Sequence, residues 1–186
     1  MPARSIVLLL LACACPGASN GAPARGSLLI APPASADNDF ARTVVLVLHK
    51  DEHGSIGIVL NRPVKMRLAE VFPEIREGKG LDQQAWAGGP VMLGINALLR
   101  TARPPNGADT LLPGVSLLAT RDLMHAQIAA GTPPSAFRVY VGLCGWGPGQ
   151  LEDEMRRGLW RVALANAAVV FDPAPDTLWT RLNAKK

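Results

Sequence analysis

The sequence predicts a single domain of the α+β class. Its 186 residues suit one domain with a core large enough to fold unaided. Hydrophobic residues make up 48% of the chain and charged residues 18%, which is a globular composition rather than a disordered one. Strand and helix patterns mix without the regular strand–helix–strand rhythm of a parallel sheet, and one clear β-hairpin is present.

The first half of the chain is predicted to be mostly strand. Residues 43–49 form a continuous β-branched run, typical of a strand buried on both faces. A turn at 50–54 joins this run to a second strand at 55–60, which Pro63 then stops because proline lacks the ladder donor. Weaker patterns predict a short strand at 27–31, a short helix at 68–76, a turn at 87–91 and a strand at 92–101.

The second half contains the helices with the clearest ends. Residues 121–130 form a predicted helix with Asp122 in its first turn and Gly131 just past its end. Residues 150–159 form another, opened by three acidic residues and closed by two arginines, as the helix macrodipole favours. The remaining predicted elements are strands at 115–119, 137–143 and 167–171 and a C-terminal helix at 176–182.

The N-terminal segment has the layout of a secretory signal peptide. Residues 1–5 carry one positive charge, residues 6–12 are an apolar run too short to span a bilayer, and small residues follow. Leu-Leu-Ala-Cys at 10–13 also resembles a lipobox, in which Cys13 carries the lipid. We therefore expect residues 1–25 to be leader and linker, and residues 26–186 to be an exported, periplasmic domain, soluble or anchored as a lipoprotein. The alternative is a cytoplasmic protein with a misassigned start or an uncleaved tail.

Charge, cysteine and histidine content argue against several functions. The net charge of +4 is spread along the chain, whereas nucleic-acid binding favours a concentrated basic face. Cys13 and Cys15 lie in the leader, so cleavage beyond residue 15 leaves Cys144 alone and no disulfide framework. His49 and His53 are four residues apart, but a strand running into a turn removes the helical spacing of metal ligands. We expect no metal site and no cofactor.

Residues 142–152, Gly-Leu-Cys-Gly-Trp-Gly-Pro-Gly-Gln-Leu-Glu, place four glycines and a proline around one tryptophan. Glycine is typical where φ is positive or where another backbone comes close, so we predict a tight turn holding the indole, followed by a helix from Gln150. The acidic first turn of that helix opposes phosphate binding. Trp146, Gln150 and Glu152 are candidates to line a small polar pocket. The alternative is that Trp146 anchors the turn and Glu152 caps its own helix.

Two further positions carry candidate chemistry. Asn61 and Arg62 end a strand, and arginine presents a planar fork of donors to a carboxylate or phosphate. The alternative is that Asn61 caps the turn and Arg62 pairs with a surface acid such as Glu70 or Glu152. Cys144, near a helix N-terminus, is a candidate nucleophile, weighed against a buried structural thiol. The carboxylates just downstream oppose thiolate formation.

Three motifs stand in order along the chain and resemble signatures of the YqgE/AlgH family (DUF179, UPF0301). They are Gly-Ser-Ile-Gly-Ile-Val-Leu-Asn-Arg-Pro at 54–63, Gly-Gly-Pro-Val at 88–91 and Gly-Trp-Gly-Pro-Gly-Gln-Leu-Glu at 145–152. The resemblance covers about residues 26–182 and implies one α+β domain with a small closed β-barrel or bifurcated sheet surrounded by helices. Family members lack an established catalytic activity, and AlgH-type names reflect a regulatory association. This chain departs from the family in Leu143-Cys144, where Tyr-Ala is typical, and in its leader.

The residues and the resemblance together indicate a non-enzymatic binding or regulatory module. Its recognition surface is expected on turns of a rigid scaffold, facing an unidentified protein or small-molecule partner. The candidate binding residues are Asn61, Arg62, Gly88, Gly89, Trp146, Gln150 and Glu152. The alternative is a cryptic hydrolase or transferase that uses Cys144 or a polar site centred on Glu152. Membrane contact is expected only through a lipid on Cys13.

Overall fold

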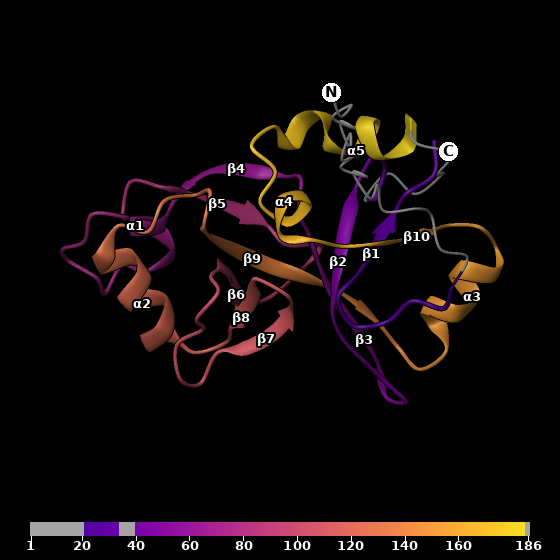
Figure 1. Cartoon of the computed structure of the whole chain (residues 1–186), viewed down its shortest axis with the longest axis horizontal. Helices are drawn as coiled ribbons and strands as arrows, with labels where there is room; N and C mark the ends of the chain where they lie inside the picture. The colour runs from indigo at the N-terminus through magenta and orange to yellow at the C-terminus, as the bar shows by residue number, and fades with distance from the viewer. Residues whose placement is uncertain (1–20, 34–39, 185–186) are drawn as a thin grey trace, which may run out of the picture.

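The computed structural model describes residues 21–33 and 40–184, and these form an α+β domain (Figure 1). The leader and the lipidation site predicted at Cys13 lie outside the described residues. None of the helices that the structure describes has the length and apolar composition needed to cross a membrane.

Eight strands follow one hydrogen-bonded path, in the order β10–β1–β2–β3–β9–β6–β8–β7, and β4 and β5 branch from it. The strands are β1 (Ser27–Ile30), β2 (Val44–Asp51), β3 (Gly54–Val59), β4 (Pro63–Arg67), β5 (Gln84–Ala87), β6 (Val91–Arg100), β7 (Asp109–Leu112), β8 (Val115–Leu118), β9 (Phe137–Trp146) and β10 (Arg161–Leu164). The helices are α1 (Leu68–Val71), α2 (Arg121–Ala130), α3 (Gln150–Arg156), α4 (Ala167–Val170) and α5 (Pro175–Ala184).

The sheet forks along β9. The second half of β9 pairs antiparallel with β3, with Cys144 opposite Gly57. The first half pairs antiparallel with β6 on one side and parallel with β5 on the other, where Trp86 lies opposite Tyr140. One strand therefore belongs to two sheets that diverge at the middle of its length, and this fork sets the positions of the motifs described below.

The sheet curls into an antiparallel half-barrel, so the expected closed barrel is wrong. β7 and β10 end the strand path and do not pair with each other. β7 approaches the start of β1, where Arg25 forms an ion pair with Asp109 and the backbone of Gly26 lies close to the carbonyl oxygen of Leu111. Both edges of β1 are already occupied by β10 and β2, so no free ladder groups remain there to pair with β7.

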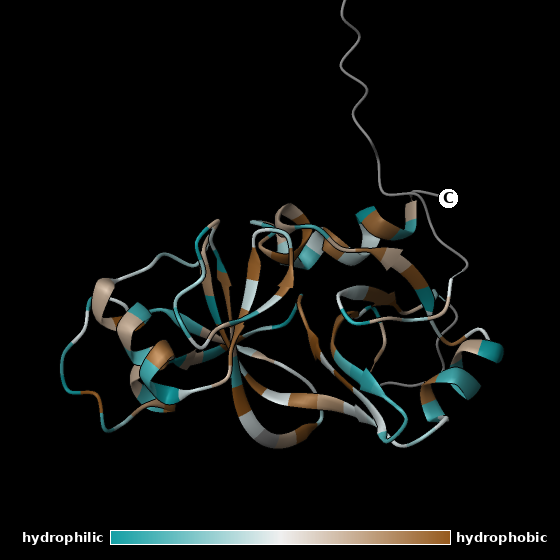
Figure 2. Cartoon of the chain, turned by 60° about the horizontal axis from the view of Figure 1, so that its bottom comes forward, coloured by the Kyte–Doolittle hydropathy of each residue, from teal (hydrophilic) through white to brown (hydrophobic). Residues whose placement is uncertain are grey.

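Three apolar clusters hold the helices against the sheet. α1 and α2 pack at one end through Leu68, Met124 and Ile128, and α3 packs at the other through Leu151. α5 covers the central cluster through Leu178. Figure 2 shows hydrophobic residues concentrated along the strands and hydrophilic residues on the outer helix α3.

The sequence predicted the long elements better than the short ones. The hairpin of β2 and β3 and the extent of α2 are confirmed, with Thr120 capping the start of α2 and Gly131 in the left-handed conformation at its end. Residues 167–171 were expected as strand but begin with helix α4, because the Asn166 side chain accepts from the Val169 N–H at 3.0 Å.

Three predicted boundaries also differ from the structure. Residues 142–146 continue β9, so the glycine-rich turn begins only at Gly147. The helix predicted at 68–76 ends at Val71, because Pro73 disfavours helical backbone at the preceding residue. Helix α3 ends at Arg156, and Trp160 is followed by the edge strand β10.

Candidate functional site

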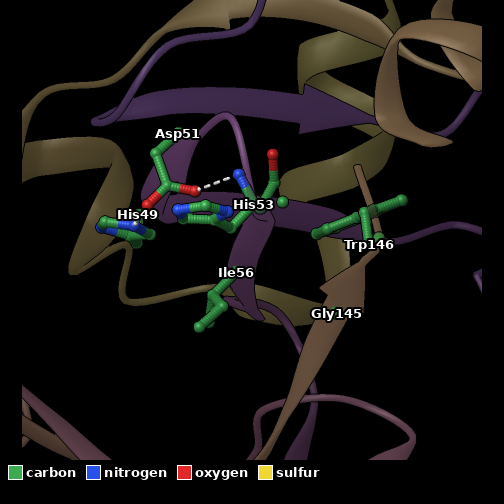
Figure 3. Close-up of a pocket in the computed structure, with 9 residues that line it drawn as sticks. His49, Asp51, His53, Ile56, Gly145 and Trp146 are labelled. Atoms are coloured by element: carbon green, nitrogen blue, oxygen red, sulfur yellow. Dashed lines mark hydrogen bonds and ion pairs between the residues drawn. The ribbon is translucent and has the colours of Figure 1, made fainter. Parts of the chain in front are cut away.

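An open hollow of about 410 Å³ lies between the tip of the β2–β3 hairpin and the end of β9 (Figure 3). It is lined by His49, Asp51, His53, Gly54, Ser55, Ile56, Gly145, Trp146 and Gly147. We call this the hairpin hollow. It contains Trp146, the aromatic residue predicted from the glycine-rich motif.

The floor of the hairpin hollow is an exposed isoleucine. Ile56 lies opposite His49 on one side and opposite Gly145 on the other. Because Gly145 has no side chain to cover its neighbour, Ile56 remains 38% exposed. Close backbone packing fixes the hairpin here, since a Cβ atom at Gly54 would lie 2.3 Å from the Trp146 carbonyl oxygen.

One wall of the hollow is a histidine–aspartate pair on β2. His49 Nε2 lies 2.8 Å from Asp51 Oδ2, and the backbone N–H of His53 donates to Asp51 Oδ1 at 2.8 Å. The hydrogen bond with His49, followed by that from the His53 backbone, holds the pKa of Asp51 below its ordinary value of 3.8. The carboxylate is therefore ionised at neutral pH and both of its oxygens are engaged.

No metal-binding arrangement of three or more His, Cys, Asp or Glu side chains occurs in the part of the chain that the structure describes. His53 is largely exposed, and its imidazole Nε2 lies 3.6 Å from the Glu52 carboxylate.

Behind the hollow, one carboxylate fixes two tryptophans. The indole N–H groups of Trp146 and Trp160 both donate to Glu154 Oε2 at 2.8 Å. The other oxygen of Glu154 accepts from the Gln150 amide at 3.0 Å. Phe40 stacks on Trp146, with ring centroids 6.4 Å apart, and meets Trp160 edge-on at 5.4 Å. The indoles are thereby locked as a rigid wall.

Gln150 and Glu152 are not among the described residues that line the hairpin hollow, so the predicted pocket of Trp146, Gln150 and Glu152 does not form; both residues instead hold neighbours of the hollow in place. The Gln150 side-chain oxygen accepts from the Gly147 N–H at 3.1 Å and holds the turn that follows β9. Glu152 forms an ion pair with Lys50 of β2 and so connects α3 to the hairpin. The hydrogen bond with Lys50 lowers the pKa of Glu152.

Sequence reasoning missed the central acid of this network. It proposed Glu152, whereas the residue that unites Trp146 with Gln150 is Glu154. The usable signal was spacing: Glu154 follows Gln150 by four residues and therefore lies on the same face of the helix, while Glu152 does not.

Gly88 and Gly89 lie at the fork of the sheet, away from the hairpin hollow. The Gly88 N–H donates to Val141 at 2.7 Å and its carbonyl accepts from Val59 at 2.8 Å, which joins β9 to β3. A Cβ atom at Gly88 would lie 2.1 Å from the Gly142 oxygen, and one at Gly89 would lie 2.3 Å from the Leu143 carbonyl. Only glycine allows the backbones to approach this closely.

Asn61 and Arg62 hold the turn that precedes β2. The Asn61 side chain accepts from the Val44 N–H at 2.9 Å and donates to the Arg42 carbonyl at 3.0 Å. Arg62 donates to the Ala41 carbonyl at 3.2 Å. Neither surface acid suggested from the sequence pairs with Arg62, because Glu70 pairs with Arg67 and Glu152 pairs with Lys50.

Cys144 is fully buried beneath the fork. Its thiol donates to the Gly88 carbonyl at 3.5 Å. Burial raises the pKa of Cys144 to about 12, against the smaller opposing effect of the nearby Arg62 charge. Since the thiolate is the nucleophilic form, this environment opposes the catalytic alternative.

Comparison with known proteins identifies the family. The family model for DUF179, described as AlgH-like, matches residues 28–186. The chain belongs to this AlgH-like family. A UPF0301 protein of Streptomyces coelicolor is 36% identical over 166 residues, covering 83% of this chain and 82% of the relative. A UPF0301 protein of Xanthomonas campestris is 35% identical over 162 residues, covering 84% and 86%.

Solved structures agree on the fold of this AlgH-like protein. The solution structure of the AlgH protein from Pseudomonas aeruginosa has a TM-score of 0.71 and 29% identity, covering 87% of each chain. A crystal structure from Corynebacterium diphtheriae has a TM-score of 0.75 over 90% of each chain, and at 24% identity it supports the fold alone. The names of these proteins state no activity, so the functional argument rests on the site.

Proposed function

We propose that this AlgH-like protein is a non-enzymatic binding module that holds its partner in the hairpin hollow. The observation that carries the proposal is the exposed Ile56, which forms the floor of two adjoining hollows. The second hollow, of about 290 Å³, shares Ile56 and His49 with the first. Together they make a groove with an apolar floor and a polar rim, which is the composition typical of recognition sites.

The rigidity of the rim supports this proposal. α3 holds it through the Gln150 contact to Gly147, the Lys50–Glu152 ion pair and the indole contacts of Glu154. A surface that is already ordered loses little conformational freedom on binding. Trp146, Gln150 and Glu152 then serve recognition by shaping the groove, with Ile56 and His49 forming the contact surface.

The enzyme alternative has less support. A hydrolase or transferase at Cys144 needs an accessible thiolate, whereas this thiol is buried with a raised pKa. A Glu152-centred site needs a carboxylate free to move a proton, whereas Glu152 is paired with Lys50.

A charge on the groove floor tests the binding proposal. Ile56→Asp places a carboxylate between the two hollows, and Leu164→Asp is the matched control because Leu164 is 60% exposed on β10, three strands away from β3. Partners cross-linked to the wild-type protein in cell extract are identified by mass spectrometry, purified and titrated by calorimetry. We expect binding to weaken at least about tenfold for Ile56→Asp and to remain for Leu164→Asp. Equal affinity of both variants contradicts the proposed site.

Export is a separate part of the proposal, and the N-terminal pattern supports it. We expect periplasmic fractionation, with membrane association through a lipid on Cys13 that Cys13→Ala abolishes. An intact N-terminus on protein recovered from the cytoplasm contradicts export and favours the uncleaved alternative.

A further inference from the structure

A second and smaller cavity lies at the fork of the sheet and shares no lining residue with the hairpin hollow. Its volume is about 150 Å³. It is lined by Val59, Arg62, Ala87, Gly89 and Pro90. We call it the fork niche. Four of its five described lining residues come from the motifs at 54–63 and 88–91, which are far apart in sequence.

Among the described residues that line the fork niche, the one charged group is the half-buried guanidinium of Arg62. Arg62 donates one hydrogen bond, from Nη2 to the Ala41 carbonyl, although a guanidinium carries five N–H donors. Within the described residues no carboxylate forms an ion pair with Arg62. The positive charge of Arg62 at the niche therefore has no carboxylate counter-ion among the described residues.

Gly89 and three apolar residues complete the described lining of the niche. Among the described residues, the Gly89 N–H donates to no backbone or side-chain acceptor, whereas both the N–H and the carbonyl of its neighbour Gly88 form backbone hydrogen bonds. Val59, Ala87 and Pro90 supply the remaining lining. Hydrogen bonds to an ion are stronger beside such low-dielectric surfaces than in open water.

We propose that the fork niche is a binding site for a short-chain monocarboxylate. In this arrangement the carboxylate accepts from the free guanidinium donors of Arg62 and from the Gly89 N–H, and a short alkyl group lies against Val59, Ala87 and Pro90. The volume of about 150 Å³ leaves room for several water molecules and so for a small organic anion.

The chemistry of the niche favours a carboxylate over a phosphate. A planar guanidinium matches a planar carboxylate with two parallel hydrogen bonds. A phosphate carries up to two charges and three acceptor oxygens, and sites for it supply several donors or a helix N-terminus. The fork niche has one cation and one N–H group, and its other three lining residues are apolar.

Amide NMR on the full chain tests the proposal with propionate as the probe. Propionate is titrated to about 50 mM, which saturates a site of millimolar affinity. Sodium chloride and inorganic phosphate at equal ionic strength are the comparison salts. We expect saturable shifts of the Gly89 amide and the Arg62 Nε–H with propionate and not with the other two. Absence of a saturable shift at these two groups, or a tighter response to phosphate, overturns the proposal.

Two variants separate binding from folding. Arg62→Gln removes the charge, and Ala87→Ile fills the niche while every donor stays in place. We expect each to weaken propionate binding at least about tenfold, and the exposed-arginine control Arg103→Gln to change it less than about twofold. If Arg62→Gln does not fold because the contact to Ala41 is lost, the propionate affinity of Ala87→Ile alone tests the site. Unchanged affinity in Ala87→Ile overturns the site.

Discussion

Removing the carboxylate of Glu154 provides the most direct test of the structure around the hairpin hollow. The two oxygens of this carboxylate accept hydrogen bonds from the indole N–H groups of Trp146 and Trp160 and from the side-chain amide of Gln150. The change Glu154→Ala leaves the N–H groups of Trp146 and Trp160 without an acceptor, and those side chains are only 4% and 6% exposed. Water therefore reaches them poorly, and we expect a clear loss of stability.

The size of the loss follows from the contacts. An unsatisfied buried donor costs about 1–3 kcal/mol. Glu154 is itself half-buried, so the lower part of that range applies to each indole, and we expect the free energy of unfolding to fall by about 2–4 kcal/mol. For a domain of this size that corresponds to roughly 4–16 °C in Tm. Glu154→Gln keeps an oxygen acceptor without the charge, so its free energy of unfolding should fall by about half as much as that of Glu154→Ala.

Urea unfolding followed by tryptophan fluorescence measures these differences. Glu152→Ala is the matched control on the same helix, because it removes only the ion pair with Lys50 on a side chain that is 46% exposed. Pairs of this kind contribute about 0–1 kcal/mol. If Glu152→Ala and Glu154→Ala lose equal stability, the assignment of Glu154 as the shared acceptor is wrong.

Three further outcomes follow from the same structure. Chemical denaturation should show that Gly88→Ala lowers the free energy of unfolding by more than about 3 kcal/mol, because its Cβ would lie 2.1 Å from a backbone oxygen. The control Gly149→Ala lies in open space at φ 73° and should lower it by about 1 kcal/mol. The pKa of Cys144 is raised to about 12, so the folded protein keeps the thiol proton while the thiol of the unfolded chain ionises near pH 9. The free energy of unfolding should therefore fall between pH 9 and 12, and it should fall less in Cys144→Ala. The native thiol should also resist alkylation until the protein is denatured. The pKa of the Asp51 carboxyl is lowered chiefly by His49, so NMR titration of His49→Ala should move it up toward 3.8.

Local patterns in the sequence determined much of the fold. The β-branched run before His49 and the turn at residues 50–54 specify the hairpin, because strand pairing across a short turn is a local interaction. The polar cap at Thr120 and the glycine at 131 specify α2 from its own residues. The short strands β4, β5, β7 and β10 carry no such signal and exist because neighbouring strands offer them ladder partners.

The motifs identified the family, and local sequence patterns were sufficient to select Trp146, Gln150 and Arg62 as candidate residues. Only the tertiary structure decided what each contacts. It places Glu154 rather than Glu152 against the indoles and leaves Ile56 uncovered opposite Gly145. It also brings Arg62 and Gly89 to the same niche. These outcomes depend on where β9 divides its pairing between two sheets, which is a long-range property set by backbone packing around Gly88 rather than by any local propensity.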